Sequence, residues 1–164
     1  MRRRVVVLLL AQMALLALRP ANTAAQQVTL SVTGASTLMQ NATLADYANG
    51  YITDATPVEY SVTLVTTTGP NSICATVRVQ GGTAGDKANA DVRWGLSTGS
   101  ITNTLTSSAV DVASHHLTSS NPTASGVIYF RTLIGWDDTP RTYLGPDLSF
   151  TVYGKREGSA SKCP

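Results

Sequence analysis

The sequence predicts an all-β fold, an antiparallel β-sandwich of seven or eight strands. Beyond residue 26, apolar and polar residues mostly alternate at period two, and no long stretch has the three-to-four-residue repeat of a helix. Signals for tight turns separate these alternating runs: Gly69-Pro70-Asn71, Gly81-Gly82, Gly99-Ser100, Asn121-Pro122 and Gly145-Pro146. Short strands at this spacing favour a sandwich, and a jelly roll or a small barrel is the alternative.

The first 25 residues have the form of a secretory signal peptide. Three arginines at positions 2–4 precede an apolar stretch at 5–18, and small residues lead to an expected cleavage between Ala25 and Gln26. The apolar stretch is shorter than the roughly 20 residues that cross a bilayer, so we expect no stable membrane span after cleavage. The sequence therefore predicts a protein that is secreted, periplasmic or on the cell surface.

Removal of this segment reverses the net charge of the chain. Four of the twelve basic residues lie within it and all ten acidic residues follow it, so the exported part has eight basic and ten acidic side chains, a net charge of −2. The remaining basic residues are scattered and form no basic run with interleaved aromatic residues. We therefore expect no nucleic-acid partner.

The exported part is long enough for one domain, which we place at residues 26–154, followed by a polar tail at 155–164. Its two cysteines, Cys74 and Cys163, are expected to pair in an oxidising compartment, which would tie the tail to the domain. The bridge would close a loop of 90 residues. Chain entropy puts its stabilisation at about 4 to 5 kcal/mol.

The first strands follow from alternation. Val28, Leu30 and Val32 are expected on one face of the first strand. The expected inward residues of the next two strands are Val58, Tyr60, Val62 and Leu64, then Ile73, Ala75, Val77 and Val79. This pattern turns Cys74 outward, so the bridge would cross the outside of a sheet. Between the first two strands, residues 41–52 carry a short helical pattern that ends at Asn49-Gly50, which predicts a single helical turn or an irregular loop entering a strand.

The later strands are predicted in the same way. Residues 92–96 should turn Val92, Trp94 and Leu96 inward, and two weaker strands are expected near 101–105 and 110–112. The segment 126–136 is apolar on both faces for much of its length, which predicts a central strand covered on both sides. The last strand should align Leu148, Phe150 and Val152.

Patterns associated with catalysis lack the context that they need. "GLSTG" at 95–99 matches the G-x-S-x-G form of a nucleophile elbow around Ser97, but no helix-forming segment follows, so a turn between strands explains it better. His115 and His116 are adjacent, and on a strand they would point to opposite faces and could not share a metal. We expect them in a polar loop, with one imidazole partly covered. We expect no enzyme activity, no metal and no cofactor.

The stretch "WDDTPRTYLGP" at 136–146 concentrates charged and aromatic residues. The sequence favours a turn that feeds the last strand, in which Asp138 or Thr139 bonds its own backbone, Arg141 neutralises an aspartate and Tyr143 anchors the chain. The same stretch also allows two functional hypotheses. One is a ligand-binding platform of Trp136 and Tyr143 with Asp137, Asp138 and Arg141 as hydrogen-bonding partners.

The other hypothesis for this stretch is calcium. Asp137 and Asp138, joined by Asp147, could supply several oxygen ligands, although they lack the regular D-x-D-x-D spacing of calcium loops. A pair of catalytic carboxylates fits less well, because adjacent residues diverge on an extended chain.

The segment "TPRTYLGPDLSFTVYG" at 139–154 resembles the P-G-T-Y stretch before the closing strand of bacterial secreted immunoglobulin-like and pilus-associated sandwich domains. "ADVRWGLSTG" and "VIYFRTLIGWDDTP" suit the same layout, so the resemblance covers about the last half of the chain. Arg141 stands where that pattern has glycine. The resemblance implies an immunoglobulin-like sandwich that serves as a structural module in the periplasm or at the cell surface.

The sequence thus predicts an exported, non-catalytic structural or adhesive surface module. Residues 26–34 would suit an edge strand or a donor strand inserted into a neighbouring subunit, so possible partners are further copies of the chain or other surface proteins. The alternative is a module that binds a carbohydrate or another surface ligand. A secreted hydrolase is the least favoured class.

Overall fold

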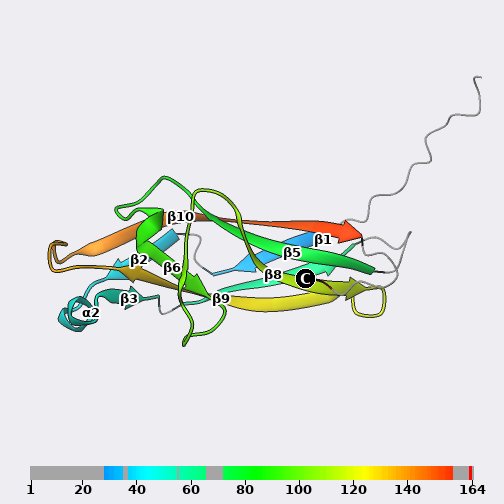
Figure 1. Cartoon of the computed structure of the whole chain (residues 1–164), viewed down its shortest axis with the longest axis horizontal. Coiled ribbons are helices and arrows are strands. Elements are labelled where there is room, and N and C mark those ends of the chain that lie inside the picture. Colours follow the sequence, from blue (N-terminus) through cyan, green and yellow to red (C-terminus); the bar gives the residue numbers. More distant parts are fainter. Residues whose placement is uncertain (1–27, 35–36, 55, 66–71, 157–162, 164) are drawn as a thin grey trace, which may run out of the picture.

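The computed structural model describes residues 28–34, 37–54, 56–65, 72–156 and 163, with the backbone alone at 37–40 and 156. The described residues form two antiparallel sheets that face each other as a sandwich (Figure 1). The predicted all-β sandwich is confirmed, and the sheets do not close into a barrel. The immunoglobulin-like type stays a prediction, and the predicted signal peptide at 1–25 lies outside the described residues.

Sheet 1 has six strands. Five of them follow the order β1 (Val28–Thr33), β4 (Val58–Leu64), β9 (Thr123–Leu133), β6 (Val92–Gly95) and β7 (Asn103–Thr104), and β3 (Tyr51–Thr53) also pairs with β9. Sheet 2 has the order β2 (Thr37–Asn41), β10 (Thr142–Arg156), β5 (Ser72–Gly81) and β8 (Val110–Thr118). The chain passes from one sheet to the other after β1, β2, β4, β5, β7, β8 and β9.

The core lies between the two sheets, and most of the residues that alternation placed inward at 58–64, 73–79 and 92–94 belong to it. Its fully covered members include Val58, Val62, Ile73, Ala75, Val77, Val79, Val92, Leu105, Leu117, Ile128 and Phe130. At about 25 cal/mol per Å² of apolar surface, this burial is the main favourable term that holds the sheets together. The predictions for 58–64, 73–79 and Leu148 are confirmed.

Two burial predictions are wrong. Leu96 is 52% exposed, because β6 ends at Gly95 and the following turn carries Leu96 out of the core. The strand predicted from residues 126–136 is central in its sheet, as expected, but only one of its faces is buried. On the other face Val127, Tyr129 and Arg131 are half-buried, because none of the segments that the structure describes forms a third layer over sheet 1 there.

Two short strands add to the predicted elements, and a short helix forms within residues 41–52. β2 pairs with β10 and β3 with β9, so both find partners far along the chain. The helix α2 (Leu44–Asn49) begins with a capping box in which Thr43 and Asp46 each bond the other's backbone N–H, and it ends at Gly50 with φ of 77°. This confirms the single turn of helix that enters a strand. It is too short to cross a membrane, and no helix of the described residues is long and apolar enough to do so.

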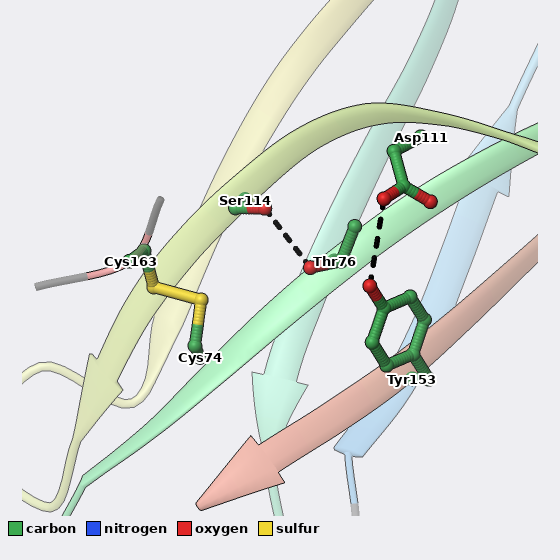
Figure 2. Close-up of a disulfide and its surroundings, with 6 residues drawn as sticks. All are labelled: Cys74, Thr76, Asp111, Ser114, Tyr153 and Cys163. Carbon is green, nitrogen blue, oxygen red and sulfur yellow. Dashed lines mark hydrogen bonds between the residues drawn. A yellow bond between two sulfur atoms is a disulfide. The ribbon is translucent and has the colours of Figure 1, made fainter. Parts of the chain in front are cut away.

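The sulfur atoms of Cys74 and Cys163 are bonded, as predicted, with their Cα atoms 5.5 Å apart. Cys74 lies on the outer face of sheet 2, alongside Thr76 and away from the inward Ala75, yet it is only 6% exposed (Figure 2). On the same face the hydroxyls of Thr76 and Ser114 are hydrogen-bonded at 2.9 Å. The disulfide therefore fixes residue 163 against the outside of sheet 2.

One hydrogen bond crosses the core between the sheets. The Tyr60 hydroxyl on β4 and Nε2 of His115 on β8 are 2.9 Å apart. Gly126 faces Tyr60 on β9, and a Cβ there would lie 2.3 Å from the Tyr60 oxygen, so a glycine is needed to leave room for this phenol. Tyr60 thus links the two layers directly.

β1 is an edge strand that pairs with β4 of its own chain over six residues. This fits the edge-strand alternative, and insertion of the same strand into a neighbour would require its release from β4. Donor-strand assembly stays a prediction. At the other end of the chain, β10 changes partner at a bulge between Leu144 and Asp147, pairing first with β2 and then with β5.

Candidate functional site

The connection between β9 and β10, residues 135–141, lies at the same end of the sandwich as α2 (Figure 1). Here Trp136 is 71% exposed, and its ring stacks on Tyr47 of α2 with centroids 5.7 Å apart and an interplanar angle of 28°. Tyr47 is itself buried against Ile52 and Ile134. One ring is therefore fixed in the protein and supports the other at the surface.

Asp138 holds the 135–141 connection in shape. Its Oδ2 accepts a hydrogen bond of 2.8 Å from the backbone N–H of Gly135, and both of its oxygens lie 2.7 Å from Nζ of Lys87. The Lys87 side chain is only 10% exposed. The Lys87 ammonium, followed by the Gly135 N–H, lowers the pKa of Asp138 from its usual value.

Arg141 and Asp86 attach the 82–87 connection to the beginning of β10. Arg141 Nη2 donates to Asp86 Oδ1 over 3.1 Å, and Asp86 Oδ2 accepts from the backbone N–H of Leu144 over 3.0 Å. The Asp86 N–H donates back to the Leu144 carbonyl over 2.7 Å. The aspartate that Arg141 neutralises, Asp86, is therefore distant in sequence. At the bulge of β10, its two hydrogen bonds with the backbone of Leu144 take the place of bonds between strands.

Tyr143 is buried, with 3% of its surface exposed, and its hydroxyl donates to the carbonyl of Thr139. The ring lies between two cations, Nζ of Lys87 and the guanidinium carbon of Arg141, each 5.1 Å from its centroid. This is the anchoring position that the turn interpretation predicts. The platform predicted from Trp136 and Tyr143 is wrong in one member, because the ring beside Trp136 is Tyr47.

A groove of about 230 Å³ opens beside Trp136. It is lined by Ala42, Leu44, Tyr47, Trp136, Asp138 and Pro140. Leu44 is 76% exposed and forms, with Trp136, an apolar surface at this end of the molecule. The hydroxyl of Tyr47 is buried and makes no hydrogen bond of normal geometry with the described residues. Burial, and secondly the neighbouring Tyr143 phenol, raise the pKa of Tyr47.

The structure brings together most of the residues predicted in this stretch. Trp136 and Asp138 line the groove, and Asp137 is exposed in the turn. Arg141 and Tyr143 do not line the groove, and their contacts hold the connection in place. Tyr47, Leu44 and Lys87 were missed. A helical pattern around Tyr47 was visible in the sequence, but its approach to Trp136, 89 residues away, carries no local signal.

The described residues do not support the calcium hypothesis. In the part of the chain that the structure describes, no three His, Cys, Asp or Glu side chains lie close enough to hold a metal ion. Both oxygens of Asp138 are occupied by Lys87. Asp147 lies beyond the bulge, where its backbone carbonyl accepts from Gly82.

The other motifs fall in structural positions. Ser97 lies in the turn between β6 and β7, where its carbonyl accepts from Ser100 N–H, so the predicted turn between strands is confirmed. His115 and His116 lie within β8 rather than in a loop, and they face opposite sides as expected, with His115 partly covered and His116 exposed. Burial lowers the pKa of His115.

Comparison of the chain with family models, curated proteins and solved structures found no match. The function is therefore inferred from the residues and their geometry alone.

Proposed function

We propose that the chain is an exported, non-catalytic adhesive module that binds a carbohydrate through Trp136. The observation that carries this proposal is the exposure of Trp136 on a rigid support. An indole that could bury a large apolar area lies instead at the surface, stacked on a fixed tyrosine ring. A lone exposed aromatic residue is ordinary, whereas an exposed stack beside a groove is a contact surface.

The support behind Trp136 favours binding. The Asp138 carboxylate closes the turn through Gly135 and is held by Lys87, and the capping box fixes the start of α2 on the other side of the groove. A surface already held in its bound shape loses little conformational entropy when a ligand arrives. The groove therefore suits recognition without a large rearrangement.

The groove combines the two features that a sugar ring requires. The face of Trp136 offers an apolar surface for the C–H groups of the ring, and Leu44 extends this surface. Asp138 also lines the groove, and its Oδ1, which accepts from Lys87, has a second lone pair that can accept from a ligand hydroxyl. Apolar walls with a few polar groups are typical of small-ligand sites.

A glycan array tests this proposal. We expect the purified protein to bind a subset of glycans, and Trp136→Ala to weaken that binding by about tenfold or more, which corresponds to about 1.4 kcal/mol. The Trp136→Phe variant should retain part of the affinity, because a smaller aromatic face remains.

The matched control is Leu96→Ala, which removes another exposed apolar side chain outside the groove. Its binding should equal that of the unchanged protein, and the circular dichroism spectra of all variants should agree. The proposal fails if no glycan binds, or if Trp136→Ala binds as well as the control.

A further inference from the structure

The outer face of sheet 1 carries rows of hydroxyl groups at the end formed by β1, β4 and β9. The strand register places Thr29, Thr63 and Thr123 in one row and Ser31, Ser61 and Ser125 in the next, and Thr33, Glu59 and Val127 form the third. Adjacent strands in a sheet lie about 4.8 Å apart, so the side chains of each row are neighbours. This face is separate from the groove beside Trp136.

The threonine and serine rows differ in the hydrogen bonds that their hydroxyls form within the protein. In the threonine row, Thr29 donates to the Thr63 carbonyl over 3.4 Å, and the Thr63 and Thr123 hydroxyls are 3.3 Å apart. In the serine row, no hydroxyl bonds to a described residue. These short side chains also leave the backbone of Tyr60 and Gly126 uncovered, since both residues line the hollow above the row.

This hollow is a groove of about 510 Å³, larger than the one beside Trp136. The serine row forms its floor, and Thr33, Glu59 and Val127 form one wall. Its polar groups are hydroxyls, backbone groups and a single carboxylate. Such a groove offers several oxygen acceptors around one negative charge.

The carboxylate of Glu59 has no counter-ion within the described ranges. Glu59 is exposed, and no described residue forms an ion pair or a hydrogen bond with it. Arg131 lies on the same face of β9, four residues beyond Val127, but its guanidinium stacks over the ring of Tyr51 at 3.8 Å. The charge in the groove is therefore complementary to a cation brought by a ligand.

We propose that this groove is a second binding site, which takes the basic side chain of a partner protein. A lysine ammonium has three donors and no acceptor, so it would bond the Glu59 carboxylate and two serine hydroxyls together. The three serines supply acceptors at the floor, where a larger side chain would close the hollow. The site does not depend on the proposed function of Trp136.

Titration of the isotope-labelled protein with Nα-acetyl-lysine methylamide, followed by NMR, tests this site. We expect the amide signals of Ser61, Ser125 and Gly126 to move, and the neutral probe Nα-acetyl-norleucine methylamide to leave them unchanged. Glu59→Gln should weaken binding of the lysine probe by about tenfold, because it removes the charge and keeps the shape. Added salt should weaken binding by the unchanged protein.

Two variants complete the experiment. Asp111→Asn removes one carboxylate from the other sheet and should leave the titration unchanged, which controls for net charge. Ser61→Val fills the floor with a residue that suits a strand, and it should abolish the shifts without unfolding the protein.

The proposal is overturned if Glu59→Gln binds the lysine probe as well as the unchanged protein does. It is also overturned if both probes act alike, or if the shifts map to residues 135–141 instead. A hexose that moves the same signals while the lysine probe does not would identify a polyol site, and that result would likewise reject a basic partner.

Discussion

At the scale of single residues, the pairing of Asp138 with Lys87 determines the shape of the Trp136 connection. Lys87 is almost covered, and its ammonium lies 2.7 Å from both oxygens of Asp138. Loss of the carboxylate would leave a buried cation without a partner and an unpaired Gly135 N–H. Breaking such a pair costs more than the pair itself contributes.

Asp138→Ala should therefore lower the free energy of unfolding at pH 7 by about 1 to 3 kcal/mol, as measured by chemical denaturation. Asp137→Ala is the matched control, since Asp137 is exposed in the same turn, and it should change stability little. Because the pKa of Asp138 is lowered in the folded state, its contribution is present above the unfolded pKa and is lost as the pH falls through the folded pKa.

A different result would change the interpretation of this turn. If Asp138→Ala kept its stability but lost glycan binding, the carboxylate would act mainly on the ligand. The sequence predicted that Asp138 or Thr139 bonds local backbone and that Tyr143 anchors the strand, because both roles depend on near neighbours, and the structure shows Asp138 in the first role. It could not identify Lys87 or Tyr47, because 51 and 89 residues separate them from the groups that they contact.

At the scale of elements, alternation predicted which residues of each long strand face inward. It did not reveal β2 or β3, because these strands are short and their partners lie far along the chain in β10 and β9. It also placed Leu96 inward, since a periodic pattern does not mark the residue at which a strand ends. The capping pair Thr43 and Asp46 was a readable signal for α2, three residues apart as such pairs are.

The disulfide joins the tail to β5, and its removal tests how much that attachment stabilises the protein. The Cys74→Ser/Cys163→Ser double variant should lose about 4 to 5 kcal/mol in guanidinium denaturation, because the unfolded chain regains the freedom of the long loop. A loss below about 1 kcal/mol would show that the unfolded chain is already restricted without the bridge. Substituting both cysteines avoids a free thiol.

At the scale of the whole molecule, the hydrogen bond between Tyr60 and His115 makes the packing of the two sheets sensitive to pH. Burial lowers the pKa of His115 in the folded state, so the unfolded chain takes up the proton more readily. Stability is then full above the unfolded pKa of histidine, near 6.5, and falls as the pH drops from there through the folded pKa.

Urea denaturation at pH 7.5 and pH 5.5 checks this expectation. The unchanged protein should be less stable at pH 5.5, and His115→Gln, which can still bond Tyr60 but does not titrate, should show a smaller difference. His116→Gln, on the opposite face of β8, is the comparison variant that removes the other histidine. An equal difference in all three proteins would assign the effect to other groups.

The overall class of fold could be predicted because a sandwich needs only alternating faces and turns between them. The order of strands in each sheet could not, because alternation describes one strand at a time. β1 next to β4 and β9 next to β6 are choices of partner made across the whole chain. The serine row across β1, β4 and β9 appears only once that order is known.

The position of the disulfide also determines how the domain would respond to mechanical load. A pull applied to the chain beyond Cys163 passes through the sulfur atoms into β5, which is hydrogen-bonded on both sides, by β10 and β8. The force therefore does not reach the end of β10, where it would open one hydrogen bond at a time. An anchored copy of this domain would resist by shear between neighbouring strands.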